Sequence, residues 1–411
     1  MEYGLIGERL SHSFSEEIHS FIGKYEYSLC PLSPEEVGGF LKKGDFLGLN
    51  VTVPYKRAVI PYLDGISENA KKIGAVNTVI NRDGRLYGCN TDFDAMKAAL
   101  EREKIVIKNK KVLILGTGGT SRTAFAVCTE LGAESVTFVS RNGTAGTVSY
   151  SEAPVLCSDA SVIINTTPVG MYPDSEKSPV DLSLFKKLEA VFDAVYNPLR
   201  TSLVIQAEGL SLKACGGLYM LVHQAIRSGE IFLGTALPAE LYEKIYRKVL
   251  SEKLGIALIG MPSCGKTTLG ALLSENTGRT HYDTDSLIEE KCALKISEIF
   301  EKYGEEYFRK IESEVIADIS EKNGAIISTG GGAVLREENV RRLKHNSVLV
   351  FLKRELESLS FTEDRPLSSN AEDLENMYHT RQKIYSSVAD CTVNADVLSS
   401  AAAKITERYS L

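Results

Sequence analysis

The feature that most constrains this chain is a short strand pattern followed at once by glycines and a helical pattern, and it occurs twice. The first strand runs from Lys111 to Leu115 and leads into Gly116-Thr117-Gly118-Gly119. The second runs from Gly255 to Ile259 and leads into the segment Gly260 to Thr267. Glycines leave the backbone bare at the point where the next helix presents free N–H groups to an anion. Each segment therefore predicts a strand of a parallel α/β sheet that delivers a phosphate site.

Two such sheets need two folding units. The chain has 411 residues, which at about 150 residues per domain allows two or three domains. Pro238 at a first turn, followed by apolar residues at helical spacing, predicts a closing helix over residues 238–250. We predict a substrate lobe over residues 1–105, a dinucleotide lobe over 106–250, a linker at 251–254 and a second nucleotide domain over 255–411.

Charge and cysteine usage exclude several classes of protein. The 47 Lys and Arg residues against 54 Asp and Glu residues give a net charge of −7, which argues against a nucleic-acid binder. The 8 cysteines show no Cys-x-x-Cys spacing, which argues against zinc and dithiol chemistry. No signal-peptide pattern and no membrane-spanning apolar run are present. We expect a cytoplasmic enzyme that acts on small molecules, with no membrane partner.

The first glycine segment favours a dinucleotide. It matches two positions of the G-x-G-x-x-G pattern, and Ser121 stands in the third. The next predicted strand, Ser135 to Val139, ends in Ser140-Arg141-Asn142 with no acidic residue, so Arg141 suits a 2′-phosphate and favours NADP over NAD. A solvated loop arginine is the alternative. The segment after Asn142 is rich in Gly, Thr and Ser and predicts a crossover helix trimmed to a loop, which weakens the argument for the 2′-phosphate.

A series of motifs in residues 1–250 gives these lobes a family resemblance. In order they are Ser11-His12-Ser13-Phe14-Ser15, Asn50-Val51-Thr52-Val53-Pro54-Tyr55-Lys56, Gly74-Ala75-Val76-Asn77-Thr78, Asn90-Thr91-Asp92, the glycine loop, Asp193-Ala194-Val195-Tyr196-Asn197-Pro198 and Met220-Leu221-Val222-His223-Gln224-Ala225. Together they resemble shikimate dehydrogenase. Glu16 departs from the family, which usually has proline there.

The resemblance implies site residues for this first half. Ser11 and Ser13 would bind the substrate carboxylate, Thr52, Asn77, Tyr196 and Gln224 would bind the rest of the substrate, and Lys56 and Asp92 would be the catalytic pair. NADP would lie on Gly116, Gly118, Gly119, Ser140, Arg141, Asn142 and Gly217. An ammonium beside a carboxylate can exchange a proton with a reacting carbonyl. A surface lysine and a helix N-cap are the alternatives for Lys56 and Asp92.

The second glycine segment is a complete phosphate-binding loop, Gly260-x-x-x-x-Gly265-Lys266-Thr267. Its amides would cradle the phosphates of ATP, Lys266 would reach the β- and γ-oxygens, and Thr267 would bind Mg2+. The predicted ATP-binding residues are Ser263, Cys264, Gly265, Lys266, Thr267 and Thr268.

Further motifs resemble shikimate kinase over residues 255–411. They are Asp283-Thr284-Asp285, Gly304-Glu305-Glu306-Tyr307-Phe308-Arg309, Gly330-Gly331-Gly332, Asp364-Arg365-Pro366-Leu367 and Arg381. The resemblance implies Asp283 beside Thr267 in the Mg2+ shell, Asp285 as the base, and Arg309 and Arg381 on the substrate carboxylate. Gly330, Gly331 and Gly332 would line the pocket, and Arg365 would close over the transferred phosphoryl group. An i−4 pair of Arg309 with Glu305, and a turn role for Asp283, are the alternatives. Residues 357–363 lack the arginine that the family often places before Arg-Pro-Leu.

Both resemblances point to the same metabolite. They imply an α/β chain in which a two-lobe dehydrogenase with a Rossmann-type nucleotide lobe precedes a P-loop kinase domain built on a parallel sheet. The chain is expected to reduce 3-dehydroshikimate with NADPH and to phosphorylate shikimate with ATP and Mg2+. One alternative is an NAD-using quinate/shikimate dehydrogenase joined to the same kinase. Another is a sensor built from degenerate enzymes, which the presence of Lys56, Asp92, Lys266 and Asp285 disfavours.

Overall fold

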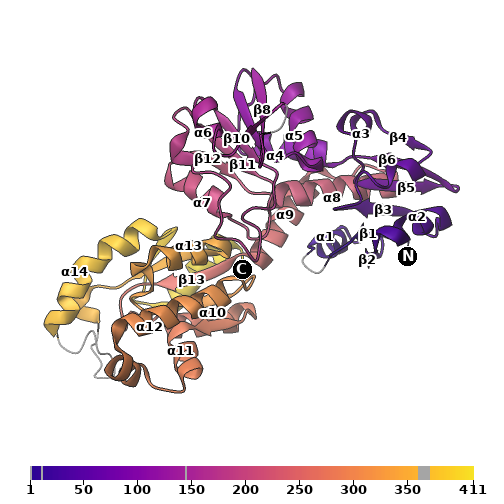
Figure 1. Cartoon of the computed structure of the whole chain (residues 1–411). Coiled ribbons are helices and arrows are strands. Elements are labelled where there is room, and N and C mark those ends of the chain that lie inside the picture. The colour runs from indigo at the N-terminus through magenta and orange to yellow at the C-terminus, as the bar shows by residue number, and fades with distance from the viewer. Residues whose placement is uncertain (1, 11–12, 144–145, 360–370) are drawn as a thin grey trace. The chain divides into compact units, whose positions relative to one another are not determined.

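The computed structural model of the chain describes residues 2–10, 13–143, 146–359 and 371–411 (Figure 1). It divides into two compact units. The first contains Met1–Asn197 and Thr201–Val249, and the second contains Pro198–Arg200 and Leu250–Leu411. No helix among the described residues is both long and apolar enough to cross a membrane.

The first sheet of unit 1 is mixed, with strand order β2-β1-β3-β5-β6-β4. Its strands are β1 (Tyr3–Gly7), β2 (Tyr27–Pro31), β3 (Gly48–Val51), β4 (Gly65–Ile66), β5 (Thr78–Arg82) and β6 (Arg85–Cys89). Its helices are α1 (Ser15–Ile22), α2 (Pro34–Lys43), the 3-10 turn η1 (Ile60–Tyr62), α3 (Glu68–Ile73) and α4 (Asp92–Arg102). β5 and β6 form a hairpin whose turn residues Asp83 and Gly84 both have positive φ, as a two-residue hairpin turn requires.

The second sheet of unit 1 is entirely parallel, with order β12-β11-β10-β7-β8-β9. Its strands are β7 (Lys111–Leu115), β8 (Ser135–Ser140), β9 (Thr147–Ser149), β10 (Val162–Asn165), β11 (Ala190–Asp193) and β12 (Lys213–Cys215). Its helices are α5 (Gly119–Glu130), α6 (Ala153–Leu156), the 3-10 turn η2 (Leu182–Leu184), α7 (Ser202–Gly209) and α8 (Leu218–Leu233). Helix α8 packs against α1 and α4 of the first sheet's layer (Figure 1).

The crossover after β8 is short, but it is more than the loop that the sequence predicts. It forms the edge strand β9, which pairs with β8 in parallel, and the single turn α6. Four helical residues are far fewer than a usual crossover helix has, so this side of the sheet carries little helical cover.

Unit 2 holds a five-stranded parallel sheet of order β14-β15-β13-β16-β17. Its strands are β13 (Gly255–Ile259), β14 (His281–Asp283), β15 (Ile326–Ser328), β16 (Ser347–Lys353) and β17 (Cys391–Asn394). Its helices are α10 (Lys266–Thr277), α11 (Thr284–Cys292), α12 (Ile296–Ser320), α13 (Glu337–Asn346), α14 (Ala371–Val388) and α15 (Leu398–Tyr409), with 3-10 turns η3 (Ala333–Leu335) and η4 (Leu356–Ser358). The α/β fold class predicted from the sequence is confirmed.

The predicted linker is mostly helical. Helix α9 (Ala239–Lys253) continues three residues past the predicted end of the closing helix, so only Leu254 separates it from β13. The sequence Ser-Glu-Lys contains no glycine or proline, and nothing local stops the helix there.

The strands that lead into the two glycine segments form the buried centre of their sheets: β13 is buried throughout, and β7 is buried except for Lys111. Leu113 of β7 is 1% exposed and Leu258 of β13 is 0% exposed. Truncation of a buried leucine removes transfer free energy and leaves a cavity, at a cost of about 3 kcal/mol.

We therefore predict that Leu258→Ala lowers the free energy of unfolding of unit 2 by about 3 kcal/mol. The measurement is urea-dependent hydrogen exchange of the whole chain, read separately on peptides of each unit. Leu113→Ala is the matched variant and should weaken protection in unit 1 instead. Equal loss of protection in both units from either variant would contradict the division into two cores.

Candidate active sites

Unit 1 contains a close lysine–carboxylate pair. Lys56 Nζ lies 2.6 Å from Asp92 Oδ2, and the two side chains are only 19% and 9% exposed. Lys56 lies in the turns that follow β3, and Asp92 is the first residue of α4. The Asp92 carboxylate therefore binds the lysine rather than acting as the helix N-cap, a position that Thr91 occupies.

Two asparagines, Asn77 and Asn90, form hydrogen bonds with the residues at the start of α4, next to the Asp92 side chain. Thr91 N donates to Asn77 Oδ1 at 2.8 Å, and Asn77 Nδ2 donates to Thr91 Oγ1 at 3.0 Å. Asp92 N donates to Asn90 Oδ1 at 3.0 Å, which orients the first turn of α4. The backbone of Lys56 accepts a bond from Val76 N at 2.7 Å. Both members of the pair are thus fixed to one segment next to Asn77.

The other predicted substrate residues are placed less directly. Ser13 Oγ accepts a bond from Ser15 N at the start of α1, and the ring of Phe14 meets Tyr196 edge-on at 5.3 Å. Gln224 lies on α8. Among the described residues, no hydrogen bond joins the side chain of Thr52 or Gln224 to the lysine pair. Ser11 lies outside the described residues.

The first glycine segment forms an open turn into α5. Gly116 has φ of 104°, and a Cβ there would lie 2.9 Å from Thr167 Cγ2, so the position admits only glycine. A Cβ at Gly118 or Gly119 would meet nothing within 4 Å, which leaves room for a ligand at the start of the helix. Gly217 begins α8, and a Cβ there would overlap the carbonyl of Ala194.

The end of β8 is polar and exposed. Ser140 Oγ lies 2.7 Å from Thr147 Oγ1 of β9, and the side chains of Arg141 and Asn142 are exposed. The structure therefore leaves the Arg141 guanidinium accessible at the sheet edge where the sequence places the 2′ position of a dinucleotide.

In unit 2 the phosphate-binding loop joins β13 to α10. Gly260 and Gly265 have φ of 148° and 98°, and Ser263 takes a left-handed φ of 61°. Lys266 is buried, and its Nζ donates to the carbonyls of Gly260 and Met261 at 3.0 and 2.7 Å. Cys264 is also buried, whereas Thr268 is exposed beside Thr267.

Asp283 connects this loop to the next strand. It ends β14 and accepts Thr267 Oγ1–H at 2.6 Å through Oδ2, while Oδ1 accepts from the N–H groups of Asp285 and Ser286 at 3.1 Å. Asp283 is thus both the N-cap of α11 and the partner of the loop threonine. Asp285 lies two residues further, in the first turn of that helix.

The triple glycine faces the charged residues of α11 and α12. A Cβ at Gly330 would lie 2.7 Å from Glu312 Oε1 and 2.9 Å from Asp285 Oδ1, and a Cβ at Gly332 would overlap the Arg309 guanidinium. A Cβ at Gly331 would lie 2.8 Å from Pro262 Cδ of the phosphate-binding loop. Only glycines allow the backbone to pass this close to all three groups.

No role was predicted for Glu312 from the sequence. It is fully buried and accepts Arg309 Nη1–H at 2.8 Å, while Arg309 also donates to Glu305 at 3.2 Å. Burial raises the pKa of Glu312, and the Arg309 charge opposes that shift. The available signal was a glutamate on the same helical face as the buried Phe308, Ile311 and Val315. The predicted i−4 pair of Arg309 therefore exists, but as the exposed half of a larger cluster.

Arg381 joins this cluster through Tyr385. Burial raises the pKa of Tyr385, and the charge of Arg381, a side-chain hydrogen bond between Arg381 and Tyr385, and the charge of Arg309 oppose that shift. Tyr385 Oη donates to the carbonyl of Gly331 at 2.5 Å. Two guanidinium groups near one glycine loop suit a carboxylate ligand. Arg365 lies outside the described residues.

The donor set of Thr267 and Asp283 fits Mg2+. This ion prefers oxygen ligands and is usually held by one or two side chains together with water and phosphate oxygens. A hydroxyl and a carboxylate oxygen 2.6 Å apart beside a phosphate-binding loop meet that requirement. In the part of the chain that the structure describes, no group of three or more His, Cys, Asp or Glu side chains forms a metal cluster.

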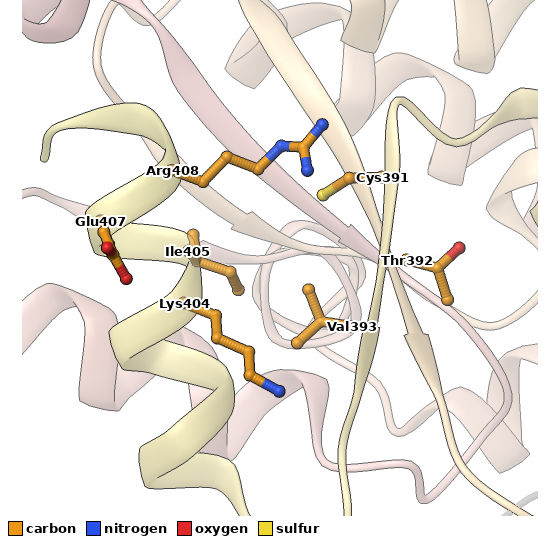
Figure 2. Close-up of a pocket in the computed structure, with 7 residues that line it drawn as sticks. All are labelled: Cys391, Thr392, Val393, Lys404, Ile405, Glu407 and Arg408. Carbon is orange, nitrogen blue, oxygen red and sulfur yellow. The ribbon is translucent and has the colours of Figure 1, made fainter.

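Two cavities lie away from these residues. One of about 360 Å³ lies between β17 and α15 and is lined by Cys391, Thr392, Val393, Lys404, Ile405, Glu407 and Arg408 (Figure 2). Another of about 160 Å³ includes Lys111 and Ser135, at the amino ends of β7 and β8. Neither contains a predicted site residue.

These sites and sheets define a chain of two nucleotide-using enzymes, a dinucleotide-dependent dehydrogenase followed by a P-loop kinase. Comparison with known proteins gives both families. Residues 5–79 match the shikimate dehydrogenase substrate binding domain, and residues 262–410 match shikimate kinase. The chain belongs to the shikimate dehydrogenase family and carries a shikimate kinase domain at its C-terminal end.

The relatives support the first assignment over nearly their whole length. Shikimate dehydrogenase (NADP(+)) of Clostridium beijerinckii is 36% identical over 59% of this chain and 96% of its own length. Shikimate dehydrogenase 1 from Peptoclostridium difficile has a TM-score of 0.57 at 36% identity, covering 61% of this chain and 98% of its own. The Thermus thermophilus enzyme, solved with NADP(H) and shikimate, has a TM-score of 0.55 at 31% identity, covering 60% and 99%.

We predict that Glu312→Gln lowers the free energy of unfolding of unit 2 by about 2 kcal/mol, because it removes the buried counter-ion of Arg309. Glu305→Gln is the matched variant and should cost less than about 1 kcal/mol, because that carboxylate is half exposed. Hydrogen exchange of α12 amides measures both. Equal decreases in the free energy of unfolding for the two variants would show that the buried Glu312 contact stabilises unit 2 no more than the half-exposed Glu305 contact does.

Proposed function

We propose that this chain reduces 3-dehydroshikimate to shikimate with NADPH and then phosphorylates shikimate with ATP to give shikimate 3-phosphate. One observation carries the proposal: each unit has its own cluster of charged residues and its own glycine turn, and the two families share one compound. The Lys56–Asp92 pair lies in unit 1, and the Lys266, Asp285 and Arg309 set lies in unit 2. The product of the first reaction is the acceptor of the second.

In the first reaction Lys56 would supply the proton. Bound NADPH supplies the hydride to the carbonyl carbon. The carbonyl oxygen takes a proton from Lys56 Nζ, and the neutral amine that results is reprotonated from water. Asp92, 2.6 Å from that nitrogen, orients it toward the substrate carbonyl. Ser11 and Ser13 would bind the substrate carboxylate, while Thr52, Asn77, Tyr196 and Gln224 would bind the rest of the substrate.

In the second reaction Asp285 would accept the proton of the attacking hydroxyl. Arg309 and Arg381 would bind the substrate carboxylate, and Gly330 to Gly332 would line the pocket. Lys266 would release its two loop carbonyls and bind the β- and γ-phosphate oxygens, joined by Arg365. Thr267 and Asp283 would hold Mg2+, which supplies charge neutralisation at the phosphates when it is bound.

We predict that Lys56→Met lowers kcat for reduction at least about 100-fold, because it removes the proton donor and keeps the aliphatic stem. Phosphorylation of added shikimate by the same preparation should stay within about twofold. Lys97→Met is the matched control, since Lys97 pairs with Glu130 at the surface of the same unit. Parallel loss of both activities in a folded Lys56 variant would overturn the two-site account.

For the second site, Lys266→Met should abolish ADP release with shikimate as the acceptor, a loss of at least about 1000-fold. The reduction of 3-dehydroshikimate should continue at the normal rate. Lys291→Met, which removes a surface pair with Glu314, serves as the control. Normal ADP release by the Lys266 variant would remove the loop from the mechanism.

The trimmed crossover after β8 favours a second candidate, in which the first site uses NAD and accepts quinate as well as shikimate. Among the described residues, the crossover after β8 contains β9 and the four-residue helix α6 but no longer helix that would help Arg141 to hold a 2′-phosphate. Arg141→Ala should raise the KM for NADPH about tenfold and leave the KM for NADH unchanged if Arg141 reads the 2′-phosphate. Faster turnover with NADH than with NADPH in the unaltered protein would favour the second candidate.

A further inference from the structure

Beneath the start of α10, two side chains that take no part in the proposed chemistry form a hydrogen-bonded chain to the phosphate-binding loop. His281 Nε2 lies 2.8 Å from Ser328 Oγ, and Ser328 Oγ donates to the carbonyl oxygen of Lys266 at 2.9 Å. His281 begins β14 and Ser328 ends β15, so the chain connects two strands to the first residue of the helix. Ser328 is buried, with 1% exposure.

The direction of these bonds follows from the donors available. A carbonyl oxygen only accepts, so the single hydroxyl proton of Ser328 is used on Lys266. Ser328 Oγ must then accept from His281, which requires the proton on Nε2 of the imidazole. The histidine therefore fixes the hydroxyl, and the hydroxyl fixes the carbonyl.

The glycine at position 270 independently indicates that the contact among His281, Ser328 and α10 is a specific feature of the fold. Gly270 lies one turn after Lys266 in α10, and a Cβ there would overlap the His281 ring and lie 2.5 Å from Ser328 Oγ. Glycine inside a helix costs about 1 kcal/mol relative to alanine. The imidazole and the hydroxyl thus occupy the space that a side chain at Gly270 would take.

The carbonyl that they bind belongs to a functional peptide unit. The peptide between Lys266 and Thr267 is planar, so fixing its C=O also fixes the Thr267 N–H, which points the opposite way, toward the open helix start. The Thr267 hydroxyl is bound to Asp283, which lies two residues after His281 on β14 and pairs in register with Ser328. Strand β14 is thus attached to the first turn of α10 at two points.

We propose that Ser328 and His281 are positioning residues for the kinase, which act through the Lys266 carbonyl to aim the Thr267 N–H and hydroxyl at the nucleotide phosphates. This proposal rests on the proposed kinase function. The proposal assigns Ser328 and His281 to the nucleotide side of the site and gives them no role on the acceptor side, where Arg309 and the triple glycine lie. Their loss should therefore affect nucleotide binding and leave acceptor binding unchanged.

The test uses the whole chain with the variants Ser328→Ala, His281→Leu and His281→Gln. Gln keeps an N–H donor at a position close to Nε2, whereas Leu removes it. The control is Thr277→Val, which also removes a hydroxyl bound to an α10 carbonyl, that of Leu273, but at the far end of the helix. Calorimetric titration with ADP, once in EDTA and once in Mg2+, gives the Kd, and steady-state kinetics gives kcat and both KM values.

We expect Ser328→Ala and His281→Leu to raise the Kd for ADP and the KM for ATP about three- to tenfold, with the KM for shikimate unchanged. His281→Gln should recover most of the loss, and Thr277→Val should bind ADP normally. Unchanged ADP binding in Ser328→Ala and His281→Leu would overturn the proposal, as would equal rises in both KM values. ADP binding is measured without turnover. A chain that binds ADP but fails to phosphorylate shikimate would therefore contradict the proposed function, while the Kd values of the variants would still test the positioning role of Ser328 and His281.

Discussion

Both units of this chain depend on the same physical constraint, the unsatisfied N–H groups where a helix starts at the carboxyl edge of a parallel sheet. At α5 and α10 those groups follow a buried strand and a glycine turn, so they stay bare and face outward. An anion satisfies them better than water does, because the helix dipole adds to the hydrogen bonds. In unit 2 the charged residues Lys266, Asp283 and Asp285 lie at that edge.

The net charge of −7 is compatible with anionic substrates because the positive charge is local. Three of the site cations are held by partners that also limit their movement. Lys56 is fixed by Asp92, Arg309 by Glu312, and Lys266 by two carbonyls of its own loop. Holding a cation in this way keeps it oriented for a ligand, whereas an unconstrained surface lysine or arginine samples many orientations.

The elements nearest the glycine segments could be predicted from sequence because their signals are local. The predicted strands Lys111 to Leu115 and Gly255 to Ile259 coincide with β7 and β13, and α10 begins at Lys266 as the loop pattern requires. Edge strand β9 is made of Thr, Val and Ser in a stretch that looks like a loop, and only its pairing with β8 makes it a strand.

Contacts between distant residues could not be predicted from any periodicity. Lys56 and Asp92 are 36 positions apart, and their pairing was expected only because the motifs resemble a family. Glu312 had no such support, and in a helix full of charges a single buried glutamate has no distinctive local pattern. The Ser328 contact with Lys266 spans 62 positions and depends on Gly270, which lies one turn further along the same helix as Lys266. Such contacts depend on the order of the strands in the sheet. That order is determined by the packing of the whole chain and not by any local sequence pattern.

The central claim is that one chain performs two consecutive reactions at two separate sites. The direct measurement incubates the whole protein with 3-dehydroshikimate, NADPH, ATP and Mg2+ and follows every species by mass spectrometry, with each component omitted in turn. Without ATP the reaction should stop at shikimate with NADPH consumed, and without NADPH only added shikimate should become phosphorylated. Failure to form shikimate 3-phosphate from added shikimate, or failure to consume NADPH with 3-dehydroshikimate, would contradict the account.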